Sequence, residues 1–182
     1  VTPTLSIEML QKVISNYPDY LPAYCHLGNI YSLQGNYPKA VAAYKTYMTG
    51  GLYSTDNLVH YASALFFNKQ YAESGKIISE GQAIDPDNFL LKRLAIYNDY
   101  ESKAYEKGLE EIETFFNNRD AKYIWQDYLY YGRLLNKAKQ YDQAADALQK
   151  AIKESSSHTE IYKDLAEVYS NSENNAEAIK AY

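Results

Sequence analysis

The sequence predicts an all-α fold in which pairs of helices repeat along the chain, and three observations support this prediction. Similar residues return at a period of 34: Gly28 and Ala62 lie 34 residues apart, as do Tyr37, Tyr71 and Tyr105 in turn. Apolar residues within each period follow helical spacing, and turn-forming residues divide each period into two halves. Periods of about 20–50 residues are typical of stacked repeat architectures.

The first complete repeat shows both halves clearly. Its first helix carries large and small residues at positions i, i+3, i+4 and i+7, which form one face of a helix. These residues are Tyr24, Leu27, Gly28 and Tyr31. The segment 34–36 then breaks the helix, because Gly35 can adopt the left-handed conformation that caps many helices. A second helix is predicted to begin near Tyr37.

Later repeats keep the same arrangement. The corresponding first-helix residues are Leu58, Tyr61, Ala62 and Leu65, then Tyr128, Tyr131, Gly132 and Leu135, then Tyr162, Leu165, Ala166 and Tyr169. A small residue at the eighth place, such as Gly28 or Gly132, lets the two helices of a pair approach closely. Because one pair cannot bury its apolar face alone, we expect each pair to stack on its neighbour.

The repeats divide the chain into segments of one continuous repeat domain. Residues 1–20 form the closing helix of a partial repeat, residues 21–54, 55–88, 89–124 and 125–158 form complete repeats, and residues 159–182 form a truncated fifth repeat. The third repeat is divergent, since it carries two additional residues before Trp125. We expect residues 117–120 to form a longer turn there.

This pattern resembles the tetratricopeptide repeat family, and the resemblance covers nearly the whole chain. The resemblance implies a right-handed α-solenoid, which is a superhelix of antiparallel helix pairs whose first helices line a concave groove. It also implies that the protein functions by binding other proteins or peptides. The framework places of the repeat account for most of the 21 tyrosines.

The resemblance also projects a set of side chains onto the concave groove, where we expect a partner protein or an extended peptide to bind. The candidate residues are Asn29, Val59, Ser63, Phe66, Arg93, Tyr97, Tyr100, Arg133, Asn136 and Lys163. Cys25, Leu129 and Glu167 fall on the same projection. Tyr97 and Tyr100 occupy the ninth and twelfth places of a first helix, where packing is not expected to require an aromatic side chain.

Two interpretations of the candidate arginines remain open. In the first, Arg93 or Arg133 binds a carboxylate of the partner, because a guanidinium group pairs with a carboxylate through two hydrogen bonds. In the second, these arginines are solvated or paired with neighbours such as Glu101, because surface ion pairs need no function. Family members that hold the acidic C-terminus of heat-shock chaperones resemble one another in a clamp of Lys and Asn, and only Asn29 matches that clamp.

The sequence predicts no enzyme, no cofactor and no metal site. The motifs HExxH, CxxC and GxSxG are absent, and so is a glycine-rich phosphate loop. His26 and His60 lie at equivalent places one repeat apart with Cys25 nearby, but tetrahedral zinc requires three or four protein ligands. We therefore predict no catalytic residue, and we expect Cys25 to be a small groove-lining or half-buried residue.

Composition and charge bear on the remaining classes of partner. The chain is 46% hydrophobic and 23% charged, which is typical of a folded, soluble protein. The net charge of the chain is −5, and its basic residues form no cluster in the sequence, so no nucleic-acid binding is predicted. No apolar run reaches the roughly 18 residues of a membrane span. A single cysteine excludes an internal disulfide framework and leaves two compartments open: the cytoplasm or, after removal of a signal peptide, the periplasm or cell envelope.

These observations predict a non-catalytic scaffold or adaptor that binds a partner protein or extended peptide in the concave groove. The alternative is a structural or regulatory repeat segment of a larger protein whose activity lies in another domain. The chain begins at Val1 without Met and stops at Tyr182 within an expected helix, so a larger parent protein is expected. Because neither end has a polar cap, we also expect self-association through the exposed repeat ends.

Overall fold

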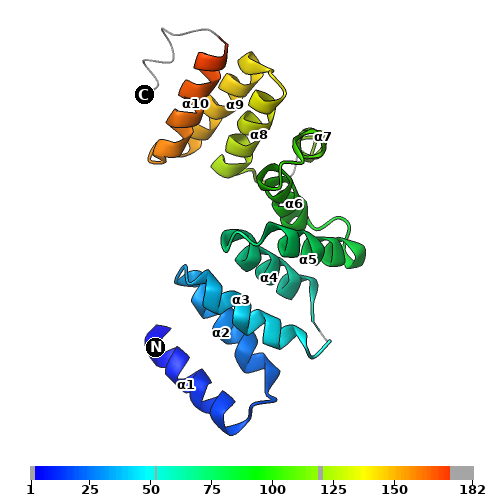
Figure 1. Cartoon of the computed structure of the whole chain (residues 1–182), viewed down its shortest axis with the longest axis vertical. Coiled ribbons are helices and arrows are strands. Elements are labelled where there is room, and N and C mark those ends of the chain that lie inside the picture. Colours follow the sequence, from blue (N-terminus) through cyan, green and yellow to red (C-terminus); the bar gives the residue numbers. More distant parts are fainter. Residues whose placement is uncertain (1–2, 52, 119–120, 173–182) are drawn as a thin grey trace. The chain divides into compact units, whose positions relative to one another are not determined.

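The computed structural model describes residues 3–51, 53–118 and 121–172, and these described residues form ten helices and no strands (Figure 1). The helices are α1 (Pro3–Asn16), α2 (Leu21–Leu33), α3 (Tyr37–Met48), α4 (Thr55–Phe67), α5 (Tyr71–Ile84), α6 (Phe89–Glu101), α7 (Tyr105–Phe115), α8 (Trp125–Lys137), α9 (Tyr141–Glu154) and α10 (Thr159–Asn171). The predicted all-α fold class is confirmed. Within the described ranges, no helix has both the length and the apolar character that crossing a membrane requires.

The chain forms two compact units, Val1–Leu94 and Ala95–Tyr182, and each is described by itself. The division falls within α6, which gives residues 89–94 to the first unit and residues 95–101 to the second. The predicted repeat boundaries stay predictions. Ala178 and Tyr182, which were expected in the last helix, lie outside the described residues.

A residue in the left-handed conformation marks the turn inside each of four helix pairs. α2 ends at Leu33 and α3 begins at Tyr37, which confirms the predicted break at residues 34–36, and Gly35 has a φ angle of 70°. The other turns hold lysines in this conformation, with φ angles of 61° at Lys69, 66° at Lys103 and 62° at Lys139. The turn geometry therefore repeats even where glycine does not, although left-handed backbone is unfavourable for a residue with a Cβ atom.

The core of the first unit lies between the helices of successive pairs. One buried cluster consists of Leu27, Tyr31, Ala40, Ala43, Tyr44, Tyr61, Ala64 and Leu65. Helix α1 packs Ile7, Leu10 and Ile14 against this cluster. The buried Ser74 hydroxyl donates to the Ala62 carbonyl at 2.9 Å, so a hydrogen bond joins α4 and α5.

The second unit has an equivalent apolar core between α8, α9 and α10. Its buried residues are Leu129, Leu135, Ala144, Ala145, Ala147, Leu148, Ala151, Ile161, Leu165 and Val168. Helices α7 and α8 are joined by residues 116–124, whereas residues 85–88 and 155–158 suffice to join α5 to α6 and α9 to α10. Residues 119 and 120 of the predicted longer turn lie outside the described residues.

Glycine at the eighth place of a repeat allows the close approach that the sequence predicts. A Cβ atom added at Gly132 would lie 2.6 Å from Leu148 Cγ and 3.1 Å from the Ala144 carbonyl oxygen. At Gly28 it would lie 2.6 Å from the Tyr44 ring. Both distances are too short for a methyl group, so α8 and α9, like α2 and α3, are in contact only because no side chain stands between them.

We predict that Gly132→Ala destabilises the protein by about 1–3 kcal/mol, because the new methyl group forces α9 away from α8. Gly108→Ala is the matched control, since the atom nearest to its Cβ would be Leu134 Cδ2 at 3.1 Å, farther away than the 2.6 Å contact at Gly132. Urea unfolding followed by circular dichroism measures both changes. Equal losses in the two variants would contradict the assigned role of Gly132.

Candidate partner-binding surface

Several candidate residues of the first unit pack against other side chains of the protein. Val59 and Phe66 are buried, and the Phe66 ring makes an edge contact with Tyr71 at a centroid distance of 5.6 Å. Asn29 is half-buried, and its side-chain oxygen accepts a hydrogen bond from the Tyr44 hydroxyl at 2.6 Å. Ser63 is half-buried. Of this set, Asn29 and Ser63 keep more of their surface accessible than Val59 and Phe66.

Arg93 is half-buried at the start of α6, within the first unit. Its guanidinium carbon lies 4.9 Å from the centre of the Phe89 ring, which belongs to the same helix. This distance is within the range of cation–π attraction, so the aromatic ring helps to orient the guanidinium group.

Cys25 lies beside the side-chain amide of Asn57. The Asn57 amide donates to the Cys25 sulfur at 3.5 Å, and burial raises the pKa of the Cys25 thiol. A raised pKa lowers the thiolate fraction and therefore the reactivity of the sulfur. His26 and His60 are exposed, and the described residues contain no group of three metal-ligating side chains close enough to share an ion.

In the second unit, Tyr97 is an interior residue. Its ring stacks on the Tyr130 ring at a centroid distance of 4.1 Å and an interplanar angle of 15°. Its hydroxyl donates to Asp127 Oδ1 at 2.6 Å, and the residue is only 8% exposed. The expectation that packing does not require an aromatic at this place is therefore wrong. The reason is that α8 presents another aromatic residue directly opposite Tyr97.

Asp127 fixes the beginning of α8. It has no exposed surface, and its second carboxylate oxygen accepts the backbone N–H of Ile124 at 2.8 Å. A carboxylate near a helix N-terminus also interacts favourably with the helix dipole. Together with the bond from Tyr97, this arrangement fastens the start of α8 to the second-unit part of α6.

Arg133 is paired within the unit. Its Nε donates to Asp164 Oδ2 at 2.6 Å, and its Nη2 lies 3.4 Å from Glu160 Oε2, so α8 and α10 are joined by a charge-assisted bond. Burial raises the pKa of Asp164, and the Arg133 guanidinium opposes that shift. Of the two interpretations left open for Arg133, the structure shows pairing, and the partners are Asp164 and Glu160 instead of Glu101.

Two tyrosine rings lie beside the Arg133 guanidinium. The guanidinium carbon is 5.5 Å from the centre of the Tyr130 ring and 5.9 Å from that of Tyr100. Tyr100 is half-buried and meets Tyr130 edge to face at 5.5 Å, while the Tyr130 hydroxyl donates to Glu101 at 3.0 Å. Burial is the main cause that raises the pKa of Tyr100 to about 12.

The remaining candidates of the second unit are Asn136 on α8 and Lys163 on α10. The Asn136 amide donates to Glu167 at 3.2 Å and its oxygen accepts from Asn171 at 3.0 Å. Lys163 is exposed on α10. We call Tyr100, Tyr130, Arg133, Asn136 and Asp164 the polar row. The structure thus brings Tyr97, Tyr100, Arg133 and Asn136 together with partners on neighbouring first helices.

Sequence reasoning missed several partners in the polar row. Asp127, Asp164 and Glu160 were not among the candidates, and Tyr130 was not recognised as a partner of Tyr97. A usable signal exists in the sequence, because Arg133 and Asp164 lie 31 residues apart and so do Asn136 and Glu167. Complementary polar residues separated by slightly less than one repeat therefore mark contacts between adjacent first helices.

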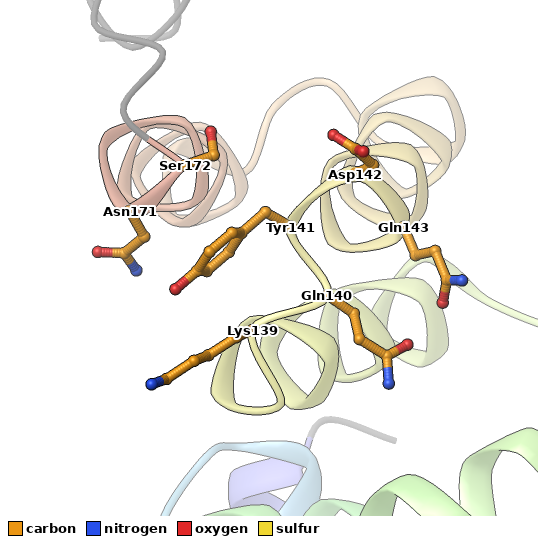
Figure 2. Close-up of a pocket in the computed structure, with 7 residues that line it drawn as sticks. All are labelled: Lys139, Gln140, Tyr141, Asp142, Gln143, Asn171 and Ser172. Atoms are coloured by element: carbon orange, nitrogen blue, oxygen red, sulfur yellow. The ribbon is translucent and has the colours of Figure 1, made fainter.

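A hollow of about 670 Å³ lies at the turn between α8 and α9. Figure 2 shows the Tyr141 hydroxyl directed toward the space between Lys139 and Asn171, whereas Asp142 and Gln143 extend from α9 away from that ring. The wall includes Asn171 and Ser172, the last described residues, so this hollow carries no functional assignment.

We predict that Tyr97→Phe costs about 1–3 kcal/mol of unfolding free energy, because the buried Asp127 carboxylate loses a hydrogen-bond donor. Tyr130→Phe is the matched control. Its acceptor, Glu101, is half-buried and can bond to water instead, so a smaller loss is expected. Urea unfolding of both variants measures the difference, and a larger loss for Tyr130→Phe would contradict it.

We also predict a contribution of Tyr100 to alkaline destabilisation. Its pKa is about 12 in the folded state against an ordinary value of 10.0, so between these values the unfolded chain loses the proton first. Stability should therefore fall as the pH rises from 10 toward 12, and less so in Tyr100→Phe. Urea midpoints at pH 9 and pH 11 measure this, with the exposed Tyr20→Phe as control. The same pH dependence in wild type and Tyr100→Phe would refute the prediction.

Comparisons with known proteins agree with this geometry. Two family models described as tetratricopeptide repeat match the sequence, one over residues 9–42 and the other over residues 135–182. None of the curated proteins compared with the chain matches it.

Solved structures show the same architecture. MamA from Desulfovibrio magneticus RS-1, from residue 41 to its end, has a TM-score of 0.72 and 15% identity, covering 90% of this chain and 91% of that one. MamA MSR-1 gives a TM-score of 0.69 and 14% identity, covering 88% and 91%. The APC/C hetero-tetramer Cut9-Hcn1 gives a TM-score of 0.81 and 15% identity, covering 99% of this chain and 35% of the matched chain.

At these identities the likeness to solved structures shows the fold alone, which is an all-α helical repeat solenoid. The matched segments lie near both ends of the chain, and paired helices with equivalent turns occupy the residues between them. The chain belongs to the tetratricopeptide repeat family.

Proposed function

We propose that the protein is a non-catalytic scaffold that binds an extended segment of a partner protein on the face formed by its first helices. Membership of the tetratricopeptide repeat family supports a protein–protein interaction scaffold. Solenoids present extended surfaces because each repeat contacts only its neighbours, and these surfaces suit elongated ligands.

The observation that carries the proposal is the polar row of the second unit. Adjacent first helices there are joined by side chains, with the Arg133–Asp164 bond at 2.6 Å and the Asn136–Glu167 bond at 3.2 Å. Side chains held in this way lose little conformational entropy when a ligand binds, and pre-ordered groups therefore support tighter binding. The half-buried Tyr100 ring adds apolar surface beside them.

The same contacts change the chemistry proposed for the ligand. A partner carboxylate at Arg133 would compete with Asp164 and Glu160, which already accept from its guanidinium group. A guanidinium group has five N–H donors, so Arg133 can still donate to a backbone carbonyl of the bound segment. We therefore propose binding through Tyr100, the Asn136 amide, the spare donors of Arg133 and the exposed Lys163 ammonium group.

A second candidate function is a structural or regulatory segment of a larger protein. The burial of Val59, Phe66 and Tyr97 favours it, because side chains used for internal packing offer little surface to a ligand. In this case the partner-binding activity would lie outside these residues.

A selection from phage-displayed random peptides on the full chain tests the proposed function. Peptides that bind wild type should bind Tyr100→Ala or Lys163→Ala about tenfold more weakly if these residues are central to the contact. Lys153→Ala is the control, since Lys153 is exposed on α9 and outside the polar row. Fluorescence anisotropy gives the affinities. Unchanged affinity in both test variants, or an equal loss in the control, would reject the proposed surface.

A further inference from the structure

A pocket lined by four aromatic side chains lies apart from the polar row, entirely within the second unit. Its volume is about 540 Å³, within the range of about 300–1,000 Å³ that is usual for ligand pockets. The lining residues are Phe116, Tyr123, Tyr128, Tyr131, Gln143, Asp146, Ala147 and Lys150. We call this the aromatic pocket, and it does not depend on the proposed function.

The connection between α7 and α8 builds the aromatic wall. Phe116 caps α7, and its ring lies 5.2 Å from Tyr128 in a stacked arrangement and 5.3 Å from Tyr131. The Tyr123 hydroxyl oxygen lies 2.6 Å from the Asn118 carbonyl oxygen and 2.9 Å from that of Phe115, so its single hydrogen is shared between these two acceptors. These bonds fold the connection back onto the end of α7, so that Tyr123 lies 4.6 Å from Phe116.

Helix α9 contributes the polar residues of the lining. Gln143, Asp146 and Lys150 are exposed, and they lie at helical spacing on one face of α9. Ala147, which is buried, also lines the pocket. A side chain that enters the pocket therefore meets both aromatic rings and hydrogen-bonding groups.

Carboxylates lie close enough to the tyrosines of the pocket to affect them. Asp146 lines it directly, and burial followed by the charge of Glu113 raises the pKa of Tyr131. Burial followed by the charge of Glu154 raises the pKa of Tyr128 in the same way. The charges of the lining residues themselves are balanced, because Lys150 accompanies Asp146. A positively charged side chain that enters the pocket would nevertheless find carboxylates near the rings, with Asp146 in the lining and Glu113 and Glu154 acting on Tyr131 and Tyr128.

We propose that the aromatic pocket binds an arginine side chain of a partner protein. A guanidinium group is planar and weakly hydrated, so it stacks on aromatic rings and at the same time donates two hydrogen bonds to a carboxylate. The aromatic pocket offers both kinds of group, with the rings of Tyr128 and Tyr131 and the polar side chains of Asp146 and Gln143 among its lining residues. A lysine ammonium group would stack less favourably because it is not planar, and an acidic side chain could neither stack in this way nor donate to Asp146.

Titration of the full chain with N-acetyl-arginine amide, followed by NMR of the tyrosine ring signals, tests this proposal. The Tyr128 and Tyr131 signals should shift and saturate with the arginine probe. They should shift much less with N-acetyl-lysine amide or N-acetyl-leucine amide at equal concentration. Equal saturation by the leucine probe would overturn the proposal in favour of an apolar ligand. Equal saturation by the lysine probe, or no shift with any probe, would also overturn it.

Variants on the exposed face of α9 separate the pocket from general charge effects. Asp146→Asn should weaken arginine binding about two- to fivefold, which is the effect of losing one exposed ion pair. Asp142→Asn is the matched control, because Asp142 is exposed on the same helix and does not line the aromatic pocket. Both substitutions are at exposed positions, so folding should be preserved. Equal affinity of the two variants would contradict a direct role of Asp146.

Discussion

The close approach of paired helices is the constraint on which the rest of the structure depends. α8 and α9 are in contact because Gly132 has no side chain, and a Cβ atom there would lie 2.6 Å from Leu148. The third repeat has Ile96 at the eighth place, and at Gly108 of its second helix an added Cβ would lie 3.4 Å from Asp99 Cβ, an ordinary contact distance. The approach that excludes a Cβ atom is therefore shown by α2–α3 and α8–α9.

Within each unit, close pairing leaves one face of a first helix next to the first helix of the following repeat. In the second unit, the contacts across these faces include polar and aromatic ones, with Arg133 bonded to Asp164 and Tyr97 to Asp127. Such bonds are directional, whereas apolar packing is not, so they fix the relative rotation of neighbouring helices. The polar row thus contributes to the geometry of the second unit as well as to its candidate binding surface.

The fold could be predicted from the sequence because its determinants are local. Helical spacing, the glycine of the first turn and the small eighth residue all lie within one repeat, and the helices begin and end close to where these signals place them. The turns at Lys69, Lys103 and Lys139 carried no comparable local signal, since lysine does not favour a positive φ angle. There the repeat period, and not the residue type, predicted the turn.

The candidate site could be predicted only in part, because its contacts cross between repeats. Tyr97 and Tyr100 lie three residues apart on one helix, yet Tyr97 is buried against Tyr130 while Tyr100 stays half-buried. The difference in burial between the two tyrosines depends on which α8 side chain lies opposite each ring. The identities of residues 97 and 100 do not reveal this. The aromatic pocket follows the same logic. Tyr128 and Tyr131 were assigned to the repeat framework, and only the longer connection before α8 brings Phe116 and Tyr123 against them. A longer connection between repeats can thus make aromatic residues of the repeat framework part of a pocket lining, because it adds side chains beside them that a shorter connection does not provide.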